Sequence, residues 1–162
     1  MTRPTLALRS VVGLVLCFAS SALGASADHK DLVSGPFKTG REVTEACLQG
    51  HEQQATDFMK TVHWTWQEQQ QVPGKGQMSI GKINLINNFC IALPGNWPRC
   101  TSCHAGYGWK DASFKFDDPK NVDCLVCHDT TGTYAKSPAG AGNPDAKVDL
   151  AKVAQSVGKP TR

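Results

Sequence analysis

Two short cysteine motifs constrain this chain more than any other feature of its 162 residues. The sequence Cys-Thr-Ser-Cys-His occupies residues 100–104, and Cys-Leu-Val-Cys-His occupies residues 124–128. A C-x-x-C-H motif is the pattern that covalent attachment of a c-type haem requires, because its two thiols form thioethers with the porphyrin vinyl groups and its histidine binds the iron. The sequence therefore predicts two covalently bound haems. The predicted thioether and iron-binding residues are Cys100, Cys103 and His104 at one site, and Cys124, Cys127 and His128 at the other.

The two cysteine pairs also have the spacing of a four-cysteine zinc ribbon. A zinc or disulfide framework, however, gives no role to the histidine that follows each pair. Histidine is a rare residue in an average chain, so its presence after both pairs favours haem. Haem attachment is therefore the main interpretation, and a zinc-stabilised structural module is the alternative.

A third stretch, at residues 47–51, is an incomplete copy of the same motif. Cys47 and His51 have the required spacing, but Gly50 stands where the second cysteine belongs. One interpretation is a third haem, held by a single thioether through Cys47 with His51 as iron ligand. The other is a site without haem, which leaves Cys47 able to form a disulfide with Cys90. The residues alone leave both interpretations open.

Six-coordinate haems need a second axial ligand, and only two histidines, His29 and His63, lie outside the three motifs. His63 begins the run His-Trp-Thr-Trp, whose aromatic residues can pack on a porphyrin, so we predict that it is an iron ligand. His29 is the weaker candidate, because residues 28–40 are expected to form an extended, polar leading segment.

The N-terminus has the pattern of a secretory signal peptide. Two arginines precede an apolar run over residues 11–19, and the small residues Ala-Ser-Ala follow at 25–27. The apolar run is too short to span a bilayer, so no transmembrane segment is expected after cleavage. We predict a signal peptide over residues 1–27 and a multihaem cytochrome c domain over residues 28–162, exported to the periplasm.

Composition bears on the fold and on the partners. The chain contains 15 Gly and 9 Pro, and outside the signal it is thin in large apolar residues, so a conventional core of side chains is not expected. We predict the fold class of a multihaem cytochrome c, with mainly short α-helices and irregular loops wrapped around haems and minor β structure. The net charge is only +3 and the basic residues are scattered, so no nucleic-acid partner is expected.

Periodicity predicts a few regular elements. Apolar residues at helical spacing indicate a helix from about Glu52 to Gln70, and a looser alternation from Met78 to Leu93 indicates one or two short strands. A last helix is predicted between a capping Asp149 and Gly158. Its apolar stripe has little in the sequence to pack against, so a truncated chain is expected. The stripe consists of Leu150, Val153, Ala154 and Val157.

Several longer stretches resemble the start of the octahaem tetrathionate reductase family of multihaem cytochromes. The likeness extends through Arg162 and covers essentially the whole predicted mature chain. The stretches are Thr44–Leu48, Phe58–Thr61 with His63–Trp66, Ile86–Cys90, Cys100–Asp111 and Asn121–Tyr134.

The resemblance implies a periplasmic oxidoreductase in which closely packed haems pass electrons to one substrate-binding haem. Members of the family reduce tetrathionate and, in some cases, nitrite or hydroxylamine. Family order makes residues 47–51 the first haem site, 100–104 the second and 124–128 the third. The active haem of the family is the second and has an unusual lysine ligand, which implies that His104 and Cys90 lie at the active centre. Lys110 is one candidate for that lysine, and other lysines remain open.

Two departures from the family affect the expected function. Family members attach eight haems, whereas this chain ends where a fourth motif is expected, and Gly50 interrupts the first site. We therefore expect an N-terminal portion of a reductase, whose partners are the missing C-terminal part, a redox protein or quinol-linked electron donor and a small inorganic substrate. A stand-alone electron carrier without catalysis is the other interpretation.

Overall fold

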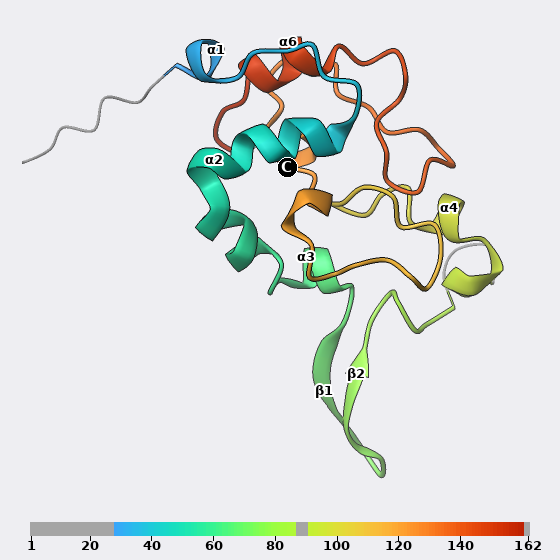
Figure 1. Cartoon of the computed structure of the whole chain (residues 1–162). Coiled ribbons are helices and arrows are strands. Elements are labelled where there is room, and N and C mark those ends of the chain that lie inside the picture. The colour runs from blue at the N-terminus through green and yellow to red at the C-terminus, as the bar shows by residue number, and fades with distance from the viewer. Residues whose placement is uncertain (1–27, 87–90, 161–162) are drawn as a thin grey trace, which may run out of the picture.

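The computed structural model describes residues 28–86 and 91–160 (Figure 1). Its helices are short and loops join them, while the β structure is a single hairpin, as the predicted fold class requires. None of the helices in this described part of the chain is long and apolar enough to cross a bilayer. The elements are α1 (His29–Leu32), α2 (Gly40–Phe58), α3 (Val62–Thr65), β1 (Glu68–Val72), β2 (Gly76–Ile80), η2 (Leu93–Gly95), α4 (Trp97–Cys100), η3 (Pro119–Asn121), α5 (Leu125–His128) and α6 (Leu150–Gln155).

The long helix α2 differs from the helix predicted over 52–70. It begins at Gly40, where the side chain of Thr39 accepts a hydrogen bond from the backbone N–H of Glu42. It ends at Phe58, and its backbone leaves helical geometry at His51, with φ −130° and ψ 31°. The predicted bounds are wrong because the apolar spacing after residue 52 continues across α3, which is a separate turn of helix.

The glutamine-rich stretch forms strand β1 instead of the end of a helix. β1 pairs antiparallel with β2, from Glu68 opposite Ile80 to Val72 opposite Gly76. Gly74 and Gly76 adopt φ values of 74° and 77°, which lie in the left-handed region that glycine tolerates, so the chain can reverse there. The hairpin extends away from the rest of the molecule (Figure 1). One of the strands predicted in 78–93 therefore exists, but it lies earlier, and residues 87–90 are outside the described part.

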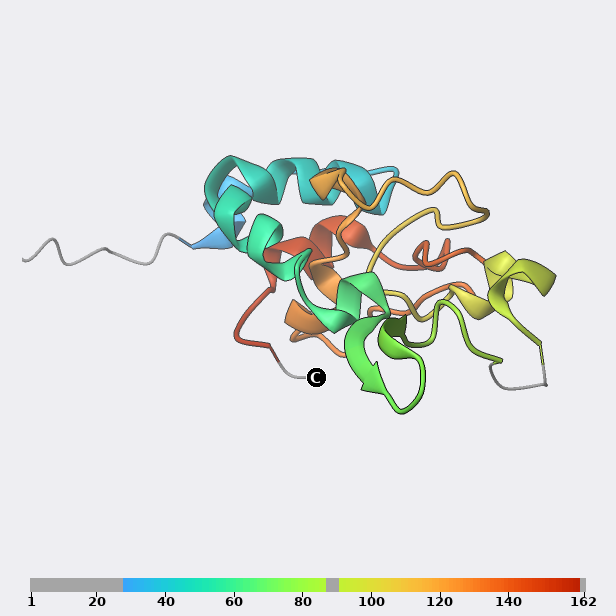
Figure 2. The ribbon, with the colours of Figure 1, turned by 90° about the horizontal axis from the view of Figure 1, so that it is seen from below.

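The last helix forms nearly as predicted. Asp149 caps α6 by accepting a hydrogen bond from the backbone N–H of Lys152 at 3.0 Å. The expectation that its apolar stripe lacks a partner is wrong, because α6 packs against α1 and α2 (Figures 1 and 2). These helices enclose a small buried core. Its members are Val33, Val43, Leu125, Tyr134, Leu150, Val153 and Ala154.

Candidate functional site

The motif at residues 124–128 has the geometry of a haem attachment site. α5 is a single helical turn held in the core by the fully buried Leu125. The Nδ1 atom of His128 lies 2.7 Å from the carbonyl oxygen of Gly158, and the backbone N–H of Gly158 donates to the carbonyl of His128 at 3.0 Å. An Nδ1–H that donates to a carbonyl leaves the Nε2 lone pair available to a metal. The half-buried Cys124 and Cys127 flank this turn, so the residues fit covalent haem.

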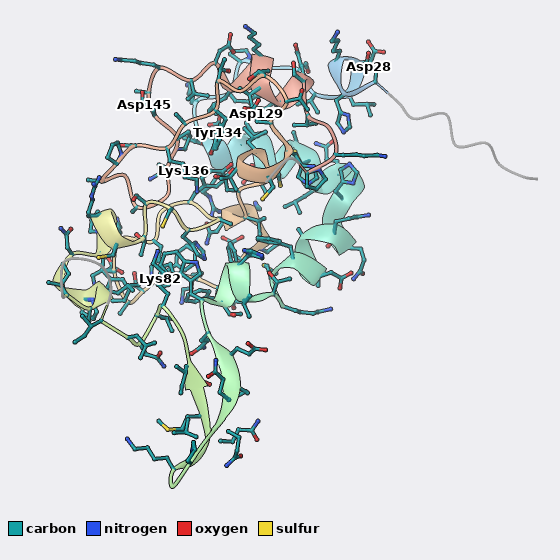
Figure 3. The ribbon with its side chains drawn as sticks, turned by 180° about the vertical axis from the view of Figure 1, so that it is seen from behind. Asp28, Lys82, Asp129, Tyr134, Lys136 and Asp145 are labelled. Carbon is teal, nitrogen blue, oxygen red and sulfur yellow. The ribbon has the colours of Figure 1, made fainter. Side chains whose placement is uncertain are left out.

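The motif at residues 100–104 follows the short helix α4. Cys100 is half-buried and Cys103 is exposed, and neither forms a disulfide within the described residues. The ammonium group of Lys82 lies 3.1 Å from the sulfur of Cys103 and 4.2 Å from the ring centre of Trp66. Lys82 lies near the base of the hairpin (Figure 3). The two thiols therefore fit thioether attachment.

His104 lies differently from His128. Its ring is fully buried, and its Nε2 atom is 2.7 Å from the carbonyl oxygen of Trp64, which makes Nε2 the donor. Its Nδ1 atom is buried without a hydrogen-bond partner. Burial lowers the pKa of His104 to about 4, so the ring is neutral at pH 7. Iron ligation by His104 stays a prediction, since the nitrogen that it needs already has a partner. Its aromatic neighbours are Trp64, Trp66, Trp109, Phe114 and Phe116.

The incomplete motif lies on α2, beside the third motif. The thiols of Cys47 and Cys124 are hydrogen-bonded to each other, which lowers the pKa of Cys47, while this bond and burial raise the pKa of Cys124. A Cβ atom added at Gly50 would meet nothing within 4 Å, so the position of the absent second cysteine is open. The Cys47–Cys90 disulfide interpretation involves Cys90, which lies outside the described residues.

The segment just before the third motif connects α2 to it. The hydroxyl of Thr44 donates to the carbonyl of Val122 at 2.7 Å and lies 4.0 Å from the sulfur of Cys124. The guanidinium of Arg41 forms an ion pair with Asp118 at 3.1 Å and also donates to the side chain of Asn121. The first and third motifs are thereby held together.

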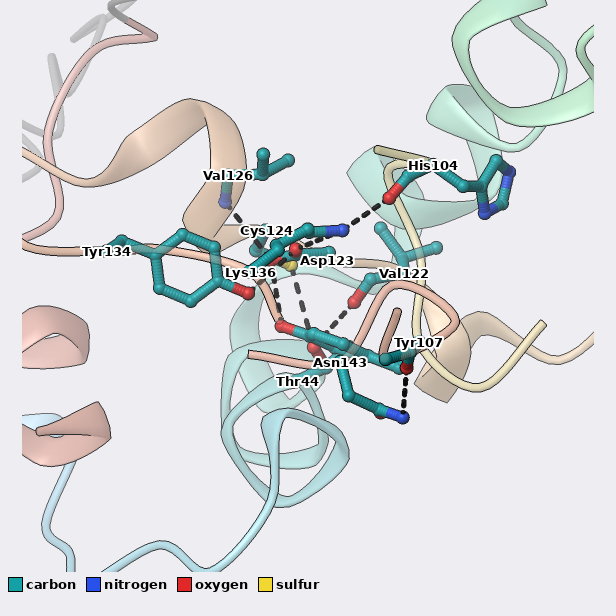
Figure 4. A network of polar contacts seen from close by, with 11 residues as sticks. Thr44, His104, Tyr107, Val122, Asp123, Cys124, Val126, Tyr134, Lys136 and Asn143 are labelled. Atoms are coloured by element: carbon teal, nitrogen blue, oxygen red, sulfur yellow. Dashed lines mark hydrogen bonds and ion pairs between the residues drawn. The ribbon is translucent and has the colours of Figure 1, made fainter. Parts of the chain in front are cut away.

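A buried carboxylate joins the second and third motifs (Figure 4). Asp123 accepts hydrogen bonds from the hydroxyls of Tyr107 at 2.9 Å and Tyr134 at 2.8 Å, and from the backbone N–H of Val126 at 3.1 Å. It also forms an ion pair with Lys136 at 2.8 Å, in which the side chains are 0% and 10% exposed. Burial and the adjacent carboxylate raise the pKa of both tyrosines.

Lys136 completes this connection. Its ammonium group also donates to the carbonyl of His104, the last residue of the second motif. Lys136 and Tyr134 line a cavity of about 320 Å³ together with Cys103 and Val126, one residue from each motif. Figure 3 shows Tyr134 and Lys136 on the same loop-rich part of the molecule. The cavity therefore lies between two predicted haem attachment points.

The other predicted site residues are dispersed. His63 is exposed on α3, and Lys110 is exposed in the loop after Trp109. Cys90 and the predicted signal peptide lie outside the described residues. Within 28–86 and 91–160, no three His, Cys, Asp or Glu side chains lie close enough together to hold a metal ion.

Sequence reasoning missed the network around Asp123. No motif relates Tyr107, Tyr134 and Lys136, since they meet only through the fold. The sequence signal for this network was Asp123, an acidic residue directly before the motif at residues 124–128. The sequence also gave no sign that the ring of His29 lies 6.2 Å from that of His51, measured between centroids.

The short helices, the loops and the two complete C-x-x-C-H motifs define the class: the chain has the fold of a multihaem cytochrome c. The particular protein that it resembles is an octahaem cytochrome c from Shewanella oneidensis, whose solved structure matches with a TM-score of 0.80 and 63% sequence identity. The match covers 85% of this chain and 31% of the other, so this chain spans about a third of the length of that protein. No protein-family model matches the chain, and no curated protein matches it.

Proposed function

We propose that this chain binds haem c covalently and transfers electrons in the periplasm as part of a multihaem reductase. The observation that carries the proposal is the coincidence of two C-x-x-C-H motifs with 63% identity to an octahaem cytochrome c. Haem c supplies reversible one-electron chemistry of iron when it is bound. The four motif cysteines attach it, and His128 offers an imidazole whose orientation Gly158 fixes. The signal-peptide pattern over residues 1–27 supports export.

Contacts between the motifs support electron transfer between neighbouring sites. Cys47 and Cys124 lie close enough to shift each other's pKa, and Cys103 and Val126 both line the cavity beside Lys136. Attachment points this close favour short distances between cofactors. The side chains of the Asp123 network are buried or nearly so, so water solvates its charges poorly.

The second site is the proposed place of substrate reduction, with tetrathionate, nitrite or hydroxylamine as substrate. The resemblance to octahaem tetrathionate reductases implies this position. Electrons would come from a redox protein or a quinol-linked donor. The second candidate function is a stand-alone electron carrier in which every iron is six-coordinate.

Two measurements test the proposal. Intact mass of the chain, expressed in a host that attaches c-type haem, should show at least two haem additions, and their absence would remove the proposal. The ferric absorption spectrum should contain a high-spin component that shifts when nitrite or hydroxylamine is added. A spectrum that is entirely low-spin and insensitive to both would favour the carrier.

A further inference from the structure

Two cysteines from different motifs have side chains that lie together. Cys47 belongs to the incomplete motif on α2, and Cys124 begins the third motif and directly precedes α5. The hydroxyl of Thr44 lies 4.0 Å from the sulfur of Cys124, and Thr44 and Cys47 share a face of α2 because they are three residues apart. The side chain of Cys47 is itself hydrogen-bonded to that of Cys124. This face of α2 is therefore directed at the first cysteine of the third motif.

Contacts on both sides of Cys124 hold it against α2. Leu125, the next residue, is 0% exposed and belongs to the buried core against which Cys47 packs. On the other side, the Thr44 hydroxyl donates to the carbonyl of Val122 at 2.7 Å (Figure 4). Because the fold fixes both backbones, the two sulfurs stay within reach of each other.

Gly50 removes the local partner that Cys47 would have in a complete motif. A C-x-x-C sequence can close a disulfide within itself, but Gly50 stands where the second cysteine belongs. A thiol that pairs with Cys47 must therefore come from elsewhere in the fold. The described residues place Cys124 in that position.

The two thiols differ in acidity in the order that thiol–disulfide exchange requires. Their hydrogen bond lowers the pKa of Cys47, whereas this bond and burial raise the pKa of Cys124. A thiolate is the nucleophile in the exchange, so Cys47 is the thiol that reacts first with an incoming disulfide. Both side chains are only half-buried, which leaves them accessible to a small oxidant.

We propose that, before haem is attached, the chain forms a Cys47–Cys124 disulfide in an oxidising compartment, and that this bond must be reduced before the third motif can bind haem. The Cys47 thiolate attacks the disulfide of a small or protein oxidant and releases one thiolate. Cys124 then attacks the sulfur of Cys47 in the mixed disulfide and releases the second. The two protons that the cysteines lose go to these thiolates, so the oxidant is reduced to two thiols.

The disulfide is tested by peptide mapping of the full chain, exported in a host without haem attachment and incubated with glutathione disulfide. Remaining thiols are blocked with iodoacetamide, and trypsin cleaves the chain without reduction. The expected product joins residues 42–60 to residues 121–136, with the link at Cys124 in the fragment spectrum. Cys47→Ser should abolish this product, whereas the matched change Cys90→Ser should leave it unchanged.

The requirement for reduction is tested on the same oxidised chain. Ferrous haem is added before and after treatment with a phosphine, which reduces disulfides, and mass spectrometry of the peptide 121–136 detects attached haem. Only the reduced sample should gain haem on this peptide. Equal haem gain in both samples would overturn this part of the inference, which rests on the proposed function.

Two other results would overturn the disulfide itself. One is a link from 42–60 to 83–99, the peptide that carries Cys90, and the other is a peptide 42–60 without any link. Both leave the proposed function standing, because the haem count of the chain from a haem-attaching host is measured separately. Absence of haem in that chain would instead remove the proposed function and leave the disulfide in place.

Discussion

Gly50 is the residue that separates the first motif from a complete C-x-x-C-H sequence. Because a side chain at this position meets open space, we predict that Gly50→Cys folds and carries three covalent haems. Intact mass measures the number. Gly50→Ser, which adds a similar side chain without a thiol, is the control and should keep the haem count of the wild type. A count of two in Gly50→Cys would contradict the prediction.

The lowered pKa of the buried His104 imidazole makes the stability of the fold depend on pH. The pKa of His104 is about 4 in the folded chain, against about 6.5 for a histidine exposed in the unfolded chain, so the folded state resists protonation. The stabilisation from the neutral ring is complete above pH 6.5 and is lost as the pH falls through about 4, by about 3 kcal/mol in the free energy of unfolding. Urea unfolding of the haem-loaded chain between these pH values measures the loss.

The control for this measurement is the exposed His63. His104→Leu should lose this part of the acid destabilisation, and His63→Leu should keep it. If His104 leaves the aromatic cluster to bind iron in the loaded protein, the His104→Leu change will leave the acid dependence unaltered and will abolish a low-spin haem signal. That result would contradict the arrangement described above.

At the scale of elements, the sequence predicted what local chemistry decides. The cap at Asp149 and the apolar stripe of α6 follow from residue types at fixed spacing. The junction between α2 and α3 does not, because an apolar period continues across the break at 59–61. Whether the glutamine-rich stretch becomes strand or helix is also not decided locally. It forms β1 because the glycine turn at 74–76 brings β2 alongside to pair with it.

The contacts that hold α2 to the third motif depend on side chains 77 to 80 residues apart in sequence, as with Arg41 and Thr44. Such pairings have no signature in a single sequence. For the same reason the sequence could predict which cysteines and histidines form the sites but could not place His29 beside His51. Only the fold brings these two segments together.

The docking of α2 gives an element-scale prediction. Thr44→Val removes the donor to the buried carbonyl of Val122, which should lower the free energy of unfolding by about 1 to 3 kcal/mol. Urea unfolding measures it. Thr56→Val is the matched control, because the hydroxyl of Thr56 donates at 3.0 Å to Glu52 in an exposed position on the same helix, and its loss should cost less. Equal losses would show that Thr44 adds nothing to docking.

Across the whole molecule, the three motifs converge on one short stretch, 118–124. Arg41 and Thr44 connect it to the first motif, and the ion pair of Asp123 with Lys136 connects it to the second. The buried charges of this pair lie between two predicted haem sites, where water screens them little. Each charge should therefore influence the reduction potentials of both haems, because buried charge is one of the determinants of haem potential.

The sign of that influence is fixed by charge. Asp123→Asn leaves the Lys136 cation unbalanced, which disfavours the more positive ferric state, so the midpoint potentials should rise in a spectroelectrochemical titration. Lys136→Met should lower them, and the double variant should return toward the wild type, since both charges are then absent. Asp57→Asn, which breaks the exposed 2.8 Å pair with Lys60, changes the net charge equally and should shift the potentials least. If Asp123→Asn shifts the midpoint potentials no more than Asp57→Asn does, or if the double variant does not reverse the shift, the Asp123–Lys136 pair acts only through folding. The comparison is valid only between chains with the same haem count. Intact mass gives that count and so identifies variants that have simply lost haem.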